Sequence, residues 1–543
     1  MKSRLLVFFI SAFYSLGLAI PARAQMPEHE HEHHGEAPEH LAKISFATSC
    51  SSSVDAPFGQ GVALLHSFEY KQAAQQFQAV TQSDPSCAMA YWGQAMTLYH
   101  ELWDPPSPAD LKKGWNLVEA AEKASEKSPR EDGYVAAMSA YYQPGKRTYA
   151  ERATAYSKAM EKLHNNYPSD EEATIFYALS LLAAEPATDT SLVWAKKAVT
   201  ILNGVLAKDP DHPGVAHYLI HACDNPHMAA EGLPAARRYA SLAPYSPHAL
   251  HMPSHIFTRL GLWQDDIKSN LAAISAAEHG PWVTGDRLHP MDFLEYAYLQ
   301  TGQDGKARVV EADAISVKHG DYTADDPLDY YYVQAHYPAL LALETRDWKA
   351  AESLEPTPHA EPEFQAMTFR AQAIAAGHLR DVTAAQAAVQ NLDNALAASR
   401  KLHPDLAVRQ VNTQKNEAHA WLAFAQGNTA EAFRLLQPVI QIQDEIGKGE
   451  VELPAREMYA DMLLEMENPK EALEQYRLSL KTDPNRFNGL YGAGRSAELA
   501  QEPSVAAAYY KQLLVNCQQG EGSDRTELDH ARKFISQTAD AAK

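Results

Sequence analysis

Small and aromatic residues return at a fixed spacing along most of this chain. Near its beginning the pattern consists of Gly61, Ala73, Phe77 and Pro85, and Ala95 follows Gly61 by 34 positions. Near the other end the same spacing relates three residues to three others, namely Ala460, Ala472 and Tyr476 to Gly494, Ala506 and Tyr510. Small residues let two helices approach, and an aromatic ring fills the gap against the next pair. The sequence contains no long run of alternating β-branched residues, the pattern that would predict a sheet.

A period of 34 residues is typical of the tetratricopeptide-repeat (TPR) helix pair. Weaker copies occupy the middle of the chain: Ala198 with Pro210, Ala235 with Tyr239 and Pro247, Gly302 with Ala307, Arg346–Trp348 with Ala350, and Gly427–Asn428 with Ala432. The sequence therefore predicts an all-α, TPR-type helical-repeat solenoid of about ten helix pairs. We expect N-terminal repeats over residues 43–345, and C-terminal repeats with a capping helix over residues 346–543. The fold alone indicates no function, because it hosts many unrelated tasks.

The first 24 residues have the three parts of a secretory signal peptide. Lys2 and Arg4 precede an apolar run from Leu5 to Ile20, and small residues flank Arg23 just before Gln25. An uncleaved anchor is the alternative, but this run of about 16 residues is short for a membrane span of roughly 20. We therefore predict an exported protein, periplasmic or extracellular, with no membrane span after signal removal. Residues 25–42 form a leader rich in His and Glu, which we expect to be disordered.

Charge and cysteine content narrow the choice of partners and compartment. The formal net charge of −22 argues against nucleic acid, because no basic stripe is present to release counterions. A negative field attracts cations and basic peptides, although acidity also keeps a large exported protein soluble. Cys50 and Cys87 lie near the start of the repeats, where a disulfide, which export permits, can clamp the N-terminal cap. We expect Cys223 and Cys517 to be buried thiols.

Histidine is concentrated in one part of the chain. Outside the leader there are 19 His, and nine of them fall between His212 and His289. In the repeat register eight His share one helix face, an arc of about 100° that is concave in the TPR fold. We expect these eight to line one groove: His66, His100, His217, His221, His251, His255, His289 and His336.

Two pairs in this set have the i, i+4 spacing, at which two imidazoles one helical turn apart can ligate one metal ion. Pro213 suits the first turn of the helix that carries His217 and His221. Pro253 lies between His251 and His255, where it either kinks or starts a helix and so can join or separate that pair. We predict that these four His converge on one zinc or copper ion. His66, His100, His289 and His336 are the predicted groove contacts farther along.

Simpler explanations compete with this prediction. A single i, i+4 His pair is more often solvated or hydrogen-bonded than a ligand set, and only its repetition in adjacent repeats favours a metal. Asp224, Asp286 and Asp292 lie close to the His in sequence. They can be carboxylate ligands or acid–base groups, but ordinary helix caps explain them equally well.

Four sequence blocks resemble a family of exported bacterial TPR proteins. The blocks are Leu64–Phe68 (LLHSF), Cys87–Gly93 (CAMAYWG), His217–Ala222 (HYLIHA) and His251–Ile256 (HMPSHI), and the resemblance spans about Phe46 to Leu299. In such proteins a Ser-Cys like Ser49-Cys50 precedes the first block, which supports pairing of Cys50 with Cys87. One departure is at Leu288–Asp292, where relatives often carry an Asn-rich Pro-His segment. The resemblance implies no established activity.

Two functions from different classes fit these observations. The first is a binding module that holds a peptide or partner protein in a His-lined concave groove. The second is a metal-dependent enzyme or a metal-binding protein that uses the His cluster with zinc or copper. Generic TPR domains favour the first, whereas the repeated i, i+4 spacing and the His-rich leader favour the second. The sequence identifies neither the ligand nor a catalysed reaction.

Overall fold

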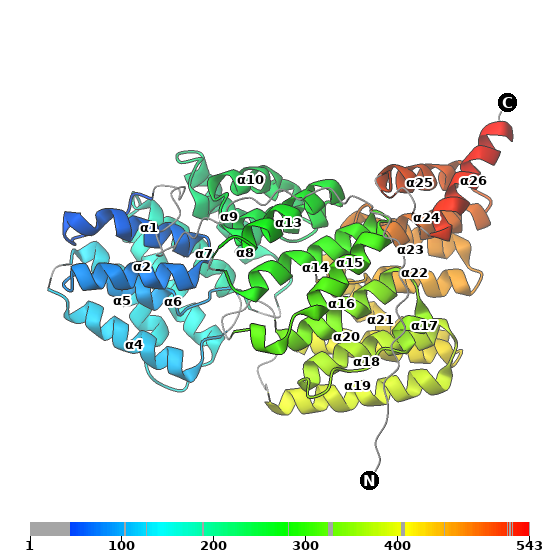
Figure 1. Ribbon diagram of the computed structural model, residues 1–543, viewed down its shortest axis with the longest axis horizontal. Helices are drawn as coiled ribbons and strands as arrows, with labels where there is room; N and C mark the ends of the chain where they lie inside the picture. The colour runs from blue at the N-terminus through cyan, green and yellow to red at the C-terminus, as the bar shows by residue number, and fades with distance from the viewer. Residues whose placement is uncertain are drawn as a thin grey trace, which may run out of the picture. The chain divides into compact units, whose positions relative to one another are not determined.

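The computed structural model describes residues 44–541 apart from 103–104, 126, 187–188, 281, 324–328, 403–407, 450, 519, 521–522 and 524. The predicted signal peptide and leader lie outside the described residues. Within them the protein is all-α, with no strand (Figure 1). The described residues belong to one compact unit. The predicted all-α solenoid is confirmed. The boundary proposed after Thr345 falls in the turn between α16 and α17, inside this unit.

The first half of the repeats begins with a short 3-10 turn, η1 (Ser52–Val54). The helices that follow are α1 (Asp55–His66), α2 (Tyr70–Ser83), α3 (Ala88–Met96), α4 (Pro108–Lys123), α5 (Pro129–Tyr142), α6 (Tyr149–Asn166), α7 (Glu171–Ala183), α8 (Val193–Leu206), α9 (Pro213–Cys223), α10 (Ala229–Leu242), α11 (Pro247–His251), α12 (Pro253–Arg259) and α13 (Trp263–Ala277). Helices α11 and α12 together take the place of one helix, as described below.

The second half continues the succession, with a 3-10 turn η2 (His319–Asp321) after α15. Its helices are α14 (Thr284–Gln300), α15 (Asp304–Ser316), α16 (Tyr330–Glu344), α17 (Trp348–Glu352), α18 (Pro362–His378), α19 (Val382–Leu402), α20 (Val408–Ala425), α21 (Thr429–Ile446), α22 (Ala455–Glu465), α23 (Pro469–Thr482), α24 (Phe487–Leu499), α25 (Pro503–Asn516) and α26 (Thr526–Ala541). None of the described helices combines the length and the apolar character that crossing a membrane requires.

The described helices form twelve consecutive pairs followed by α26, which is more than the predicted ten or so. The pair formed by α5 and α6 is one that the repeat pattern did not reveal. Here a Cβ added at Gly133 would lie 2.4 Å from Leu163, which follows it by 30 residues, whereas Phe77 follows Gly61 by 16. The close contact in this pair is therefore made at a different spacing from that of the pattern.

Glycines of the repeat pattern lie against the aromatic ring of the same helix pair. A Cβ added at Gly61 would lie 2.8 Å from the ring of Phe77, and one added at Gly494 would lie 2.5 Å from the ring of Tyr510. Real Cβ atoms do not approach so closely, so these positions need a residue without a side chain. The spacing seen in the sequence therefore reflects helix-to-helix contact.

The predicted disulfide between Cys50 and Cys87 is confirmed. The two Cα atoms are 4.8 Å apart, and the bond ties the segment before α1 to the residue that caps α3. By the chain-entropy estimate a loop of this length contributes roughly 3 to 4 kcal/mol. Cys223 and Cys517 are buried free thiols, as expected.

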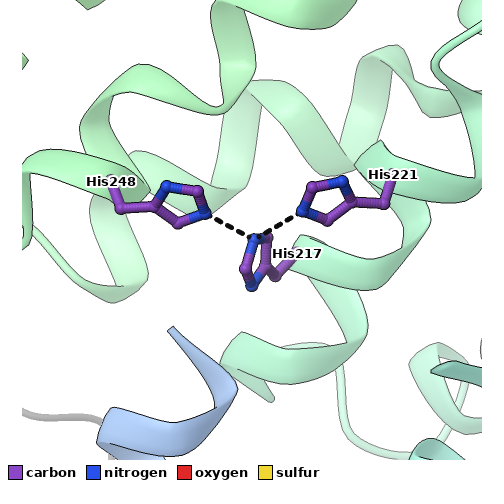
Figure 2. Close-up of side chains that lie close together, drawn as sticks. All are labelled: His217, His221 and His248. Carbon is purple, nitrogen blue, oxygen red and sulfur yellow. Dashed lines mark hydrogen bonds between the residues drawn. The ribbon is translucent and has the colours of Figure 1, made fainter. Parts of the chain in front are cut away.

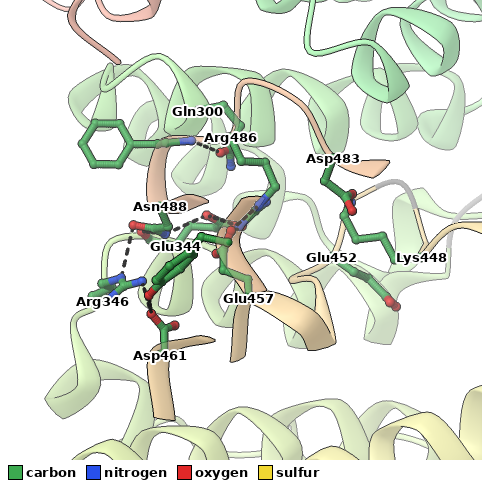
Figure 3. A network of polar contacts seen from close by, with 12 residues as sticks. Gln300, Glu344, Arg346, Lys448, Glu452, Glu457, Asp461, Asp483, Arg486 and Asn488 are labelled. Atoms are coloured by element: carbon green, nitrogen blue, oxygen red, sulfur yellow. Dashed lines mark hydrogen bonds and ion pairs between the residues drawn. The ribbon is translucent and has the colours of Figure 1, made fainter. Parts of the chain in front are cut away.

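A buried charge network connects helices of the second half of the chain (Figure 3). Arg486, just before α24, contacts Glu344 at 2.9 Å and Glu457 at 3.0 Å, and its guanidinium also donates to the hydroxyl of Tyr296. Because these partners lie on α16, α22 and α14, one fully buried cation links four helices. A buried cation needs such partners, since desolvation without them is costly.

Candidate metal centre

Three imidazoles from α9 and α11 meet at one point (Figure 2). We call His217, His221 and His248 the first histidine group. Nε2 of His217 lies 3.0 Å from Nε2 of His248 and 3.1 Å from Nε2 of His221. Pro213 occupies the first turn of α9 as predicted, and the helix runs unbroken to Cys223, which places His217 and His221 one turn apart. His248 enters from the short helix α11.

A second set of three imidazoles lies beside the first. His251, His255 and His289, the second histidine group, each offer a ring nitrogen within 4.8 Å of the other two. Nε2 of His251 lies 3.0 Å from Nε2 of His255. His289 comes from α14, one helix pair further along the chain.

The bend at Pro253 brings the second pair together. Helix α11 ends at His251 and α12 begins at Pro253, but Met252 between them keeps right-handed helical dihedrals, so the two pieces continue each other. Proline has no N–H, and the N–H of His255 donates to the carbonyl of Met252 at 3.2 Å. The proline therefore bends the helix and still leaves His251 and His255 one turn apart.

Hydrogen bonds fix which nitrogen of each ring in this pair carries hydrogen. Nδ1 of His251 lies 2.7 Å from the side-chain oxygen of Asn270. The amide nitrogen of Asn270 donates to Asp266, and this contact fixes which end of the amide is the oxygen. Nδ1 of His255 lies 2.9 Å from a carboxylate oxygen of Asp224. Both acceptors require an N–H at Nδ1, so in the neutral rings Nε2 bears a lone pair. The hydroxyl of Ser254, 3.3 Å from Nδ1 of His251, is farther away than Asn270.

The two facing nitrogens of His251 and His255 are therefore both acceptors. Two lone pairs 3.0 Å apart repel each other unless a cation, either a proton or a metal ion, lies between them. A carboxylate or amide that orients a metal-binding His through its other nitrogen is a recurrent feature of metal sites. The arrangement around Asp224 and Asn270 has this form.

His217 in the first histidine group is oriented in the same way. Its Nδ1 lies 2.6 Å from the backbone carbonyl of His66, which can only accept, so Nε2 of the neutral ring is an acceptor. That single lone pair faces two further imidazole nitrogens. An ion held by all three rings would engage the three Nε2 atoms at once.

Burial keeps the central imidazoles neutral. The pKa of His217 lies well below its usual range because the ring is buried, and the neighbouring His221 lowers it further. Burial followed by His217 depresses the pKa of His248, and burial followed by His289 and His255 depresses that of His251. Neutral imidazole is the form that binds metal, so these rings need no deprotonation step near neutral pH.

Each histidine group also has its own phenylalanine. The Phe68 ring centroid lies 4.4 Å from that of His217, 5.5 Å from His221 and 5.8 Å from His248. The Phe293 centroid lies 4.8 Å from His251, 4.7 Å from His255 and 5.6 Å from His289. Both phenylalanines are buried, and such apolar surroundings limit the access of solvent to a metal site.

Comparisons with known proteins add only to the description of the fold. No protein-family model matches the chain, and no curated protein matches it. Among solved structures, a tetratricopeptide repeat protein from Parabacteroides merdae is 14% identical over 53% of this chain and 98% of its own, with a TM-score of 0.27. The human IFIT1 dimer with m7Gppp-AAAA is 12% identical over 79% of this chain and 90% of its own, with a TM-score of 0.34. Similarity at this level does not extend to a site.

His66, predicted as a groove contact, instead lies in a fully buried cluster with Glu172 and His212. Its Nε2 is 2.8 Å from one carboxylate oxygen of Glu172, and His212 lies 3.1 Å from the other. Burial alone would raise the pKa of Glu172, but the two imidazoles hold it well below its usual range. Each imidazole of this cluster pairs with its own carboxylate oxygen at hydrogen-bonding distance, and the backbone carbonyl of His66 accepts from Nδ1 of His217.

The other predicted groove contacts differ in their surroundings. His100 stacks on Tyr70, with centroids 4.4 Å apart, and His336 pairs with Asp292 at 3.2 Å. His289, placed farther along the groove by the sequence, belongs instead to the second histidine group.

Of the three nearby aspartates, Asp224 and Asp292 contact imidazoles. Asp286 accepts from the N–H of Val283 at the start of α14.

The repeat pattern did not indicate His248. It predicted that the two i, i+4 pairs would share one ion. The structure divides them between two groups, each an i, i+4 pair completed by a His of the following helix pair. The weak signal for His248 was its position one helical turn before His251. His248 was not predicted because α11 has only five residues and Pro253 follows it closely. The 34-residue repeat does not define which way the side chains of so short a helix point.

Proposed function

We propose that this protein binds transition-metal ions, zinc or copper, through the first and second histidine groups. The observation that carries the proposal is the pair of acceptor nitrogens of His251 and His255, which face each other at 3.0 Å with their other nitrogens already committed. A metal ion between these two lone pairs removes their repulsion, and an ion in the first group would accept the lone pair that Nε2 of His217 directs toward His221 and His248.

The ligand set indicates which ions fit. Imidazole nitrogen suits zinc and copper, whereas magnesium and calcium prefer oxygen ligands. Three imidazoles supply three of the four ligands of tetrahedral zinc, and in catalytic zinc sites the fourth position holds water or substrate. Each group thus offers three protein ligands and one open coordination position, as catalytic zinc sites do, and this arrangement is compatible with enzymatic activity.

The alternative proposal is a groove that binds a peptide or a partner protein, a use common among TPR domains. In that case the imidazoles would serve as hydrogen-bonding contacts. Their dense packing against one another within the described residues supports the metal proposal better, because a peptide can reach only exposed nitrogens. His217 and His251 are 0% and 1% exposed.

We further propose that the protein is exported and belongs to the bacterial TPR family that its four sequence blocks resemble. The disulfide between Cys50 and Cys87 supports export, since such bonds persist in oxidising compartments. The N-terminal pattern of charge, apolar run and small residues supports it independently.

Metal analysis of untagged mature protein tests the proposed function. Protein dialysed against zinc or copper should retain stoichiometric metal, and His217→Ala combined with His251→Ala should lower the retained amount by two ions per chain. His279→Ala, at an exposed position after α13, is the matched control and should retain the wild-type amount. Equal metal content in the double variant and the control would exclude the histidine groups as the binding site.

A further inference from the structure

The two histidine groups share a single short helix. His248 of the first group and His251 of the second both lie on α11, three residues apart. Ser246 caps this helix by accepting from the N–H of Ala249, and its hydroxyl donates to Glu69 at 2.5 Å. The five-residue helix is thus held at its start and continues directly into α12. Any displacement of one group therefore moves the other.

Imidazoles also contact each other across the two groups. The ring centroids of His221 and His255 are 6.5 Å apart, close to the 6.4 Å between His221 and His248 within the first group. The two groups are therefore in ring contact through His221 and His255, at a separation only slightly larger than the widest one within a group. Within the groups, Nε2 of His217 lies 3.0 Å from His248 and 3.1 Å from His221, and the Nε2 atoms of His251 and His255 are 3.0 Å apart.

The two groups are built in the same way. Each consists of an i, i+4 pair together with one His from the following helix pair, and the paired positions are 34 residues apart, from His217 to His251 and from His221 to His255. Duplication of the repeat therefore places two equivalent His pairs in adjacent units, and His248 and His289 complete them from different register positions. In known two-metal sites the ions lie about 3.5 to 4 Å apart and clamp oxygens between them.

We infer that the two histidine groups form one binuclear centre, in which two metal ions share a bridging oxygen ligand derived from water. This inference rests on the metal binding proposed above. Six imidazoles are neutral ligands, so two divalent ions bring a total charge of four that this ligand set does not compensate. A bridging hydroxide lies where both ions attract it most strongly. Asp224 contacts the second group at Nδ1 of His255 and so acts through that ring.

Electron paramagnetic resonance (EPR) of the copper(II)-loaded full-length mature protein tests the inference. We expect two copper ions per chain and loss of most of the copper(II) signal, because a bridging oxygen couples the two unpaired electrons. Denaturation of the same sample in acid should restore the full signal, which distinguishes coupling from reduction to copper(I). His221→Ala and His289→Ala should each bind one copper ion and give the full signal of that ion in the folded state.

The possible results separate the two proposals. Two copper ions with an undiminished signal in the folded wild type would overturn the binuclear centre and leave metal binding standing, as would a single bound ion. Absence of stoichiometric copper would overturn both. Circular dichroism of each variant, together with retention of one ion, shows that lost coupling does not arise from unfolding. His279→Ala should behave as the wild type.

Discussion

Asp224 links the second histidine group to the rest of the protein through one carboxylate. One of its oxygens accepts from Nδ1 of His255 and the other accepts from the guanidinium of Arg259, both at 2.9 Å. Arg259 also donates to the backbone carbonyl of Lys448, in the loop after α21. The carboxylate therefore fixes the His255 ring, and the C-terminal repeats fix the carboxylate.

Replacing Asp224 should weaken metal binding in the second group alone. In Asp224→Asn the negative charge that stabilises the metal-bound His255 is lost, and we expect the zinc affinity of this group to fall about 10- to 100-fold. Competition with a chromophoric chelator measures the two affinities. Asp265→Asn, which changes an exposed aspartate paired with Arg237, is the control. An unchanged affinity in Asp224→Asn would contradict the orienting role of the carboxylate.

Individual site residues were only partly predictable. His217, His221, His251 and His255 stand out because their spacing matches the helical turn, which is local information. Their partners His248 and His289 come from other helices, and tertiary packing decides which residues these are. The burial of His66 was likewise hidden, since its register position does not reveal that Glu172 and His212 surround it.

At the scale of helices, close approach between paired helices controls stability. Gly494 of α24 faces Tyr510 of α25, and an added Cβ would lie 2.5 Å from that ring. Gly204 of α8 has no described atom within 4 Å of an added Cβ. The same substitution should therefore have opposite effects at the two positions.

We expect Gly494→Ala to destabilise the protein by about 1 to 3 kcal/mol through overpacking. Gly204→Ala should stabilise it by about 0.5 to 1 kcal/mol, because alanine loses less conformational freedom in a helix. Because a long repeat array need not unfold in two states, hydrogen exchange of α24 and of α8 gives the local changes. Shifts of the same sign in both variants would contradict the packing described for the repeat pattern.

The succession of helices was easier to predict than their number. Gly61 with Phe77 and Gly494 with Tyr510 reveal helix pairs directly, since the close contact requires those residue types. The pair formed by α5 and α6 was not found, because its close contact, between Gly133 and Leu163, does not have the spacing of the pattern. Pro253 allowed two interpretations from sequence alone, and the backbone of Met252 decides between them.

At the scale of the whole molecule, buried ion pairs hold distant repeats together. Removing Arg486 leaves the carboxylates of Glu344 and Glu457 buried without their cation. We expect Arg486→Met to cost about 3 to 5 kcal/mol and to reduce hydrogen-exchange protection in α14, α16, α22 and α24 together. In Arg434→Met, which removes an exposed pair with Glu431 on one helix, protection should change little. Loss confined to α24 would show that Arg486 does not link these helices.

The central claim is that the two histidine groups hold metal ions. Anomalous X-ray scattering from crystals of the zinc- or copper-loaded protein tests it most directly, because the signal locates the metal itself. The account predicts one peak among His217, His221 and His248 and a second among His251, His255 and His289. Metal-loaded crystals with peaks only elsewhere, or with none, would contradict it.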